Sequence, residues 1–289
     1  MSVLGDVEQL VSTLNTKGII SFPGFFDTQI VEALKAQGRE LMDADEPYLK
    51  YFRDGPNCRI AAAPCNLDEH NAWDKLSASQ KALESCGIDE IAKGFLGDGY
   101  GLAQMICDYS QPPHDGELFP LHFDNFDGQK CLKAFIYLTD CDKSNAAFRY
   151  VPYSQHIANA HVASVRKTTT TRRDDDNALS ELLDTKDQHL KEFLAESPEN
   201  RAMLEKLEFL ASSPNDSYEY CVEGPAGTLV IFDTMGIHGG GKIESAERMV
   251  FRCHYVDSDY VFKHLSDQLP PLQAIASKVA RRFRNAFAS

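Results

Sequence analysis

The stretch LAQMICDY at residues 102–109 marks the point where the sequence pattern of this chain changes to β. Further candidate strands follow it, separated by turn residues. They lie at Leu132–Leu138, Phe148–Val151, Thr228–Phe232 and Met249–Val256. The second half of the chain is therefore predicted to be built on β-sheets.

The part of the chain before residue 102 is mostly helical in pattern, with one early strand at Gly18–Phe22. Helices are expected at Val7–Leu14, after Asp27 as an N-cap to about Met42, and in Ser77–Leu96 with an interruption near Gly87. Glu46–Cys65 has no clear period and contains three prolines, so it is expected to be irregular.

Helices followed by a strand-rich half predict one domain covering residues 1–289, mainly β with flanking helices. The expected architecture is a double-stranded β-helix, a jelly roll of the cupin-like kind. A polar and charged insertion with helical pieces, at about residues 168–216, interrupts it. An excursion of this length often carries function, so we expect a lid. A C-terminal helix is expected at about Leu272–Phe287.

The composition narrows the class of partner. The 289 residues carry a net charge of -14, which argues against nucleic acid or an anionic membrane, because both need a basic patch. No apolar run of membrane-spanning length and no secretory signal is visible. The eight cysteines form no CxxC pair, which is typical of reduced thiols. A cytoplasmic monomer or homodimer acting on a small molecule is expected.

The tetrapeptide LHFD at residues 121–124 is the sharpest chemical signal. In a strand, His122 and Asp124 share a face, and an imidazole with a carboxylate suits Fe(II) or a similar divalent metal. His238, followed by three glycines, is the best candidate for a third ligand. Each element alone is common in proteins without a metal site, and the combination favours one. Such a triad leaves positions open for a bidentate co-substrate and O2.

Arg248 follows His238 by ten residues and opens the predicted strand Met249–Val256. An arginine fork can bind the distal carboxylate of 2-oxoglutarate with two hydrogen bonds. Arg252 lies on the same face of that strand and competes for this role. The alternative for either arginine is a salt bridge with an acidic side chain.

In these features the chain resembles the phytanoyl-CoA dioxygenase family of Fe(II)- and 2-oxoglutarate-dependent oxygenases. The resemblance runs in the family's order through most of the chain, on 18–24, the H-x-D of His122 and Asp124, NAAF at 145–148, VPYSQH at 151–156, GTL at 227–229, HGGG at 238–241, and Arg248. It implies the triad His122, Asp124 and His238, with Arg248 at the tail of 2-oxoglutarate. It further implies a polar pocket residue at Gln104 and puts Phe135 beside the co-substrate.

The chain departs from the family's pattern in three places. NAAF and VPYSQH differ from the usual turns, and Ser110-Gln111 replace a lysine that commonly precedes H-x-D. If that lysine assists 2-oxoglutarate in relatives, Thr139, Tyr137 or Gln104 takes its place here.

The resulting hypothesis is a dioxygenase that uses Fe(II), 2-oxoglutarate and O2 and releases succinate and CO2. It would hydroxylate, desaturate or cyclise a small metabolite or natural-product intermediate, with Asn125, Phe126 and Arg252 as candidate substrate contacts. Asp124 argues against halogenation, because related halogenases carry a small residue there. The alternatives are a catalytically silent jelly roll that binds a small molecule, and a metal-dependent hydrolase or isomerase.

Overall fold

The computed structural model describes residues 4–44, 49–55, 57–65, 75–113, 117–122, 124, 130–156 and 220–257. The insertion expected at about 168–216, the helix expected at Leu272–Phe287, and the candidate substrate contacts Asn125 and Phe126 lie outside these residues.

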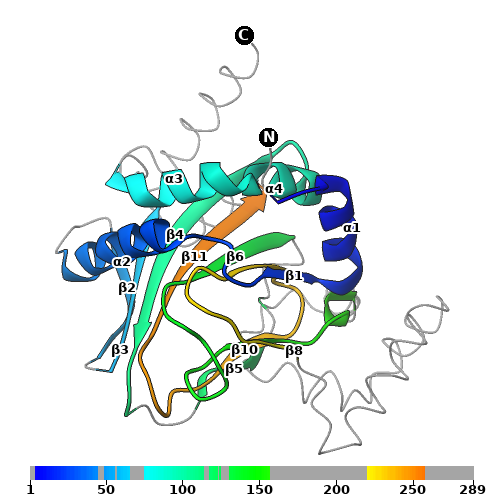
Figure 1. Ribbon diagram of the computed structural model, residues 1–289. Helices are drawn as coiled ribbons and strands as arrows, with labels where there is room; N and C mark the ends of the chain where they lie inside the picture. The colour runs from blue at the N-terminus through cyan, green and yellow to red at the C-terminus, as the bar shows by residue number, and fades with distance from the viewer. Residues whose placement is uncertain are drawn as a thin grey trace, which may run out of the picture.

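Two antiparallel sheets form the body of the described chain (Figure 1). The larger has the order β1 (Ile19–Phe22), β9 (Leu229–Asp233), β6 (Cys131–Tyr137), β11 (Arg248–Asp257), β4 (Tyr100–Ser110), β3 (Cys58–Pro64), β2 (Lys50–Gly55). The smaller has the order β5 (Glu117–His122), β10 (His238–Lys242), β7 (Phe148–Tyr150), β8 (Tyr220–Val222). The facing sheets confirm the predicted jelly roll with a mainly β fold.

In the described residues four helices accompany the sheets: α1 (Val7–Lys17), α2 (Thr28–Asp43), α3 (Ser77–Cys86) and α4 (Ile88–Leu96). Figure 1 shows α2, α3 and α4 along one side of the larger sheet, with β5 and β10 on the other. Asp27 caps α2 as predicted, its carboxylate accepting from the amide of Ile30 at 2.9 Å. Gly87, at φ +70°, separates α3 from α4, which confirms the predicted interruption.

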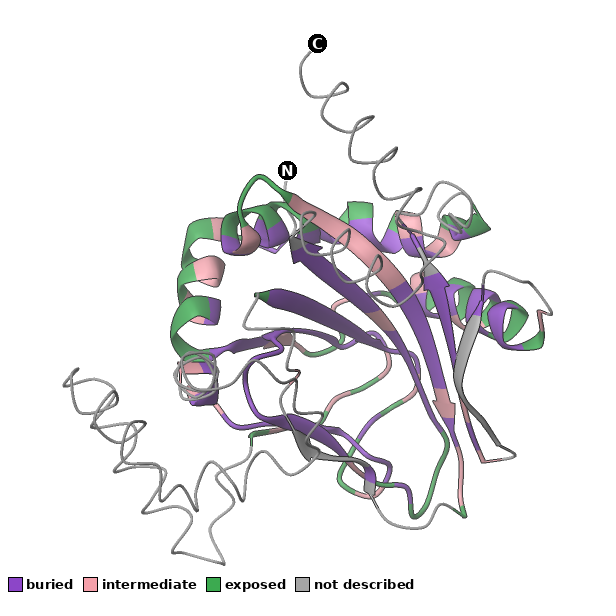
Figure 2. Cartoon of the chain, turned by 180° about the vertical axis from the view of Figure 1, so that it is seen from behind, coloured by how far each residue is buried: buried purple, intermediate pink, exposed green. Residues whose placement is uncertain are grey.

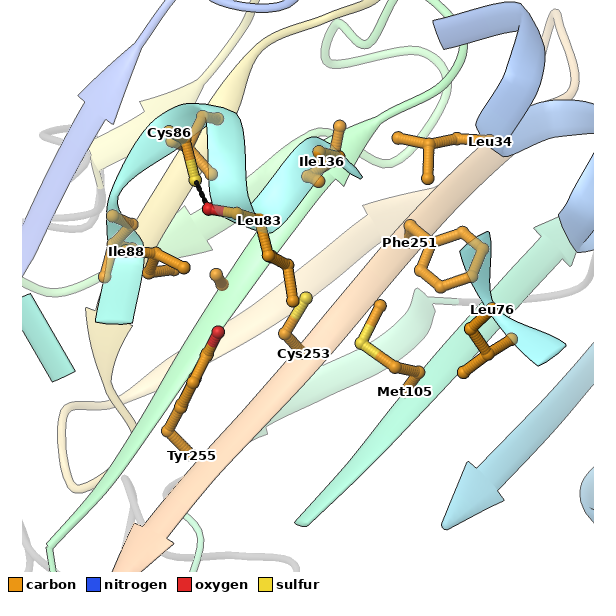
Figure 3. Close-up of a cluster of buried hydrophobic side chains, with 14 of the residues drawn as sticks. Leu34, Leu76, Leu83, Cys86, Ile88, Met105, Ile136, Phe251, Cys253 and Tyr255 are labelled. Carbon is orange, nitrogen blue, oxygen red and sulfur yellow. Dashed lines mark hydrogen bonds between the residues drawn. The ribbon is translucent and has the colours of Figure 1, made fainter. Parts of the chain in front are cut away.

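The main core lies between the helices and the larger sheet. Side chains of a strand point alternately to its two faces, so the odd-numbered residues of β11, among them Phe251 and Cys253, point to the helices. Figure 3 shows them packed against helix residues such as Leu34 and Leu83. The central strands β6 and β9 are buried along their length, while the outer faces of the helices are exposed (Figure 2). The helices therefore supply one apolar cover, which leaves the other face of the sheet for the site.

A second core fills the space between the two sheets. It is rich in aromatic side chains, and Phe148 of the smaller sheet packs on Phe135 and Phe232 of the larger at ring-centroid distances of 4.9 and 4.4 Å. The even-numbered residues of β11 point into this space, because the odd-numbered ones face the helices. Functional side chains on the inner face thus sit beside a rigid aromatic packing.

The expectation of an irregular segment at Glu46–Cys65 was wrong. Lys50–Gly55 and Cys58–Pro64 form an antiparallel hairpin at the edge of the larger sheet. The middle of the second strand, Ile60–Ala63, is buried on both faces, so it shows an apolar run without alternation. The register shift between Tyr51 and Arg53 removes the period from the first strand.

No helix in the part of the chain that the structure describes is long and apolar enough to cross a membrane.

Candidate metal and 2-oxoglutarate site

The backbone brings the three predicted metal ligands to one end of the smaller sheet. His238 and His122 are partners in the antiparallel pairing of β10 with β5. The sequence analysis assumed that His122 and Asp124 share a strand. In the structure β5 ends at His122, so Asp124 lies beyond the strand. The amide of Asp124 instead donates to the carbonyl of Thr234 at 3.0 Å. This bond to the turn before β10 returns Asp124 toward His238.

The described donor atoms fit a divalent metal. His238 Nε2 lies 3.7 Å from Asp124 Oδ2. Two donors that each sit about 2.1 Å from one ion can be at most about 4 Å apart, so a single ion can take both. His238 Nδ1 lies 2.7 Å from the carbonyl oxygen of Gly236. A carbonyl only accepts, so Nδ1 carries the proton and Nε2 is left as the ligand atom. His122 is placed here by its backbone alone.

Lys133 is a residue that the sequence reasoning missed. It lies on β6, is buried, and its ammonium contacts Asp124 Oδ2 at 2.5 Å. A lysine inside the apolar run CLKAFIY at 131–137 was the available signal, because a buried lysine needs a partner. Lys133 therefore fixes the carboxylate of the predicted metal ligand.

Arg248 and Arg252 point from β11 to one carboxylate, that of Asp108 on β4. Asp108 Oδ2 lies 3.2 Å from Arg248 Nη1 and 3.6 Å from Arg252 Nη2. Asp108 is fully buried, and Arg248 is 1% exposed. Asp108 thus faces two cations, of which Arg248 is fully buried and Arg252 has an 11% exposed side chain. The sequence analysis also missed Asp108. Its ion pairs show that both arginines form the salt bridge that was considered as the alternative to binding 2-oxoglutarate.

The other residues expected at the co-substrate make different kinds of contact in the structure. Phe135 packs under Arg252, whose guanidinium carbon lies 5.7 Å from the ring centroid. The Tyr137 hydroxyl donates to Val222 O at 2.8 Å and accepts from Phe148 N at 2.9 Å. Thr139 Oγ1 accepts from the amide of Met249 at 3.1 Å. Tyr137 and Thr139 thus use their hydroxyls on backbone groups near the site.

Gln104 pairs with His254 across β4 and β11, with Gln104 Nε2 and His254 Nδ1 2.9 Å apart. His254 is 7% exposed, and burial, together with the cations Lys133 and Arg252, lowers the pKa of its imidazole well below the usual value. The structure puts His254 on the same sheet face as Lys133 and Arg252.

Comparison with known families adds to this geometry. The family described as Phytanoyl-CoA dioxygenase (PhyH) matches residues 14–250. The chain belongs to this family. The match contains all three predicted metal ligands and Arg248, and it confirms the resemblance noted in the sequence. No curated protein sequence matches the chain.

Several solved structures share the fold of this chain. The epimerase SnoN, in complex with Fe3+, alpha ketoglutarate and nogalamycin RO, has a TM-score of 0.56 at 16% identity, over 87% of this chain and 83% of its own. The carbocyclase SnoK from nogalamycin biosynthesis has a TM-score of 0.52 at 17% identity, over 89% and 86%. EctD from S. alaskensis, with 2-oxoglutarate and 5-hydroxyectoine, has a TM-score of 0.56 at 15% identity, over 87% and 76%. At these identities the likeness concerns the fold.

Proposed function

We propose that this protein is a dioxygenase that depends on Fe(II), 2-oxoglutarate and O2 and acts on a small metabolite or natural-product intermediate. The observation that carries the proposal is the arrangement around His238. Its Nε2 is aimed at Asp124 and its backbone is the register partner of His122, within a chain of the phytanoyl-CoA dioxygenase family. SnoN and EctD, which have the same fold, are solved with bound iron or 2-oxoglutarate, in agreement with the expected cofactors.

The residues would divide the work as follows. His122, Asp124 and His238 would hold the metal, with Gly236 fixing the tautomer of His238. Arg248 would bind the distal carboxylate of 2-oxoglutarate, because it is buried, charged and already held by Asp108. Phe135 and the aromatic core would exclude water from that side. When bound, Fe(II) and 2-oxoglutarate supply the oxidation of a C–H bond by O2, with release of succinate and CO2.

We further propose that the chain is one domain and that the segment at about 168–216 covers the site as a lid. The reaction outcome is hydroxylation, desaturation or ring closure. Mass spectrometry of the product separates these outcomes. Hydroxylation adds one oxygen atom, desaturation or ring closure removes two hydrogens, and epimerisation leaves the formula unchanged.

The deciding experiment is anaerobic titration of the purified chain with Fe(II) and 2-oxoglutarate, followed by absorbance. The chelate of Fe(II) with a keto acid has a visible charge-transfer band, which we expect for the wild type and not for Asp124→Ala or His238→Ala. Admission of O2 should then give succinate in the wild type alone. Absence of the band would favour a catalytically silent jelly roll. Turnover of a substrate without O2 would favour a metal-dependent hydrolase or isomerase.

A further inference from the structure

Residues 233–237 lead from the end of β9 to the start of β10, and two contacts that orient the predicted metal ligands end on them. The carbonyl of Thr234 accepts from the amide of Asp124 at 3.0 Å. The carbonyl oxygen of Gly236 lies 2.7 Å from His238 Nδ1. We call residues 233–237 the ligand turn. A shift of its backbone would move Asp124 and His238 relative to each other.

Two side chains, those of Asp233 and Ser154, hold the ligand turn in this conformation. Asp233 Oδ1 accepts from the amide of Met235 at 2.9 Å, within the turn. The hydroxyl of Ser154 accepts from the amide of Ile237 at 2.7 Å and donates to the carbonyl of Val151 at 2.6 Å. Asp233 is 2% exposed and Ser154 is fully buried. Removal of either side chain would therefore leave a buried amide of the turn without its partner.

Backbone hydrogen bonds to other parts of the chain hold the ligand turn as well. They join Asp233 N to Gly18 O, Thr234 N to Cys131 O and Val151 N to Ile237 O, at 2.8, 3.1 and 2.8 Å. Tyr150 packs beside them, because its hydroxyl donates to the carbonyl of Asp233 and a Cβ added at Gly236 would overlap that hydroxyl. The turn is thus a rigid support, and metal ligands depend on such support to keep the geometry that one ion requires.

From these contacts we infer that Ser154 and Asp233 are positioning residues for the metal and act through the ligand turn. The inference rests on the proposed function, of which it uses the metal site alone. Ser154 fixes the backbone just before His238, and Asp233 fixes the middle of the turn, between the two carbonyls that contact the ligands. Asp124 and His238 are then held within reach of one ion in advance, so that metal binding does not have to order the turn.

The test measures binding of Co(II) alone to the purified, metal-free full chain, in the absence of 2-oxoglutarate. Co(II) is a divalent ion that nitrogen and oxygen ligands also bind, and calorimetry gives its affinity while its visible absorption reports the coordination geometry. Ser154→Ala should weaken the affinity roughly tenfold or more, the usual effect of losing a group that supports a metal ligand, and should alter the absorption.

Two substitutions at Asp233 separate the lost hydrogen bond from the lost charge. Asp233→Ala should weaken Co(II) binding as Ser154→Ala does. Asp233→Asn should bind as the wild type does, because the asparagine oxygen can still accept from the amide of Met235. Both variants remove the same charge, so a difference between them belongs to the hydrogen bond. Asp233→Leu, which also lacks the acceptor and leaves no cavity, replaces Asp233→Ala if that variant does not fold.

The matched control is Thr228→Val, at the other end of β9. The buried hydroxyl of Thr228 accepts from the amide of Gly24 at 3.2 Å and donates to the carbonyl of Pro225 at 2.7 Å. It therefore makes the same pair of bonds as Ser154, but at the turn before β9. We expect Ser154→Ala and Thr228→Val to lower the midpoint of thermal unfolding of the metal-free chain similarly, and Ser154→Ala alone to weaken Co(II) binding.

Unchanged Co(II) affinity in Ser154→Ala, or in the folded Asp233 variant that lacks the acceptor, refutes the role of the residue concerned. An equal loss of affinity in Thr228→Val overturns the inference, because the effect then follows general stability. A wild type that binds Co(II) but shows no charge-transfer band with Fe(II) and 2-oxoglutarate refutes the oxygenase and leaves the positioning role standing. A wild type that binds no Co(II) overturns both.

Discussion

At the scale of single residues, the site depends on buried charges that share partners. Asp108 accepts from Arg248 and lies within ion-pair distance of Arg252, while Lys133 holds Asp124. Removing one member of a buried ion pair leaves the other uncompensated, at a cost of about 3–5 kcal/mol. Substitutions that keep the charge are therefore the informative ones.

The two arginines can be told apart by their lysine variants. We expect Arg248→Lys to raise the KM for 2-oxoglutarate about tenfold or more, because lysine keeps the charge facing Asp108 but cannot form a two-pronged bond to a carboxylate. Arg252→Lys is the matched control and should change this KM much less. A larger effect of Arg252→Lys would assign the tail of the co-substrate to Arg252.

The carboxyl group of Asp233 makes the stability of the folded chain depend on pH. Burial raises the pKa of its carboxyl from 3.8 to about 6, although the amide of Met235 donates to it. Between these two values the folded chain binds more protons than the unfolded chain, so stability falls as the pH rises through this window. At neutral pH the free energy of unfolding is lower by roughly 2–3 kcal/mol than it is below both pKa values.

Asp233→Asn should therefore be more stable than the wild type at neutral pH and similar to it at about pH 4. The asparagine oxygen can still accept from Met235. Urea unfolding at several pH values measures the difference in free energy of unfolding between the two proteins. A difference that does not grow between about pH 4 and about pH 7 would show that Asp233 is ionised without cost in the fold.

At the scale of elements, strand β11 contributes side chains to both faces of the larger sheet. Its odd-numbered residues join the helix-side core, and its even-numbered residues Arg248, Arg252 and His254 face the site. The helices thereby hold the strand that carries the functional side chains. The turn before β9 is held equally tightly, because Gly227 donates to Tyr137 O at 2.7 Å and accepts from Phe26 N at 2.9 Å.

Gly227→Ala should destabilise the chain by roughly 2–5 kcal/mol. Gly227 has φ +90°, and an added Cβ would lie 2.2 Å from the carbonyl oxygen of Phe26. The control is Gly97→Ala, where φ is +97° but nothing lies within 4 Å, so only backbone strain of about 1–2 kcal/mol is expected. Thermal unfolding of both variants measures the difference, and equal losses would contradict the predicted clash.

At the scale of the whole molecule, hydrogen bonds tie the two sheets together across the aromatic core. The hydroxyl of Tyr137, on the larger sheet, bonds to Val222 and Phe148 on the smaller one. Tyr150 of the smaller sheet donates to Asp233 O of the larger one at 3.0 Å. These bonds set the spacing of the sheets, and hence the distance between His238 on one and Lys133 on the other.

Tyr137→Phe should cost about 1–3 kcal/mol of stability, because it leaves a buried amide and a buried carbonyl without partners. Tyr109→Phe is the control, since its partly exposed hydroxyl bonds to Gln111 and Glu247, which water can replace. Denaturant titration measures both free energies of unfolding. A loss for Tyr137→Phe no larger than that for Tyr109→Phe would mean that the hydroxyl does not join the sheets.

Local sequence patterns determined much of this protein. Period-2 strands, the Asp27 cap and the break at Gly87 predicted elements and the jelly roll, because these signals act within a few residues. The H-x-D motif, the glycines after His238, and Arg248 ten residues after His238 carried the resemblance to the family. Only the tertiary structure decided that Lys133 meets Asp124, that Asp108 stands between two arginines, that Asp124 lies past its strand, and that Lys50–Pro64 is a hairpin. The physical reason is that ion pairs and strand pairing join residues far apart in the chain, and a buried strand or a buried charge shows its partner only when the sheets are assembled.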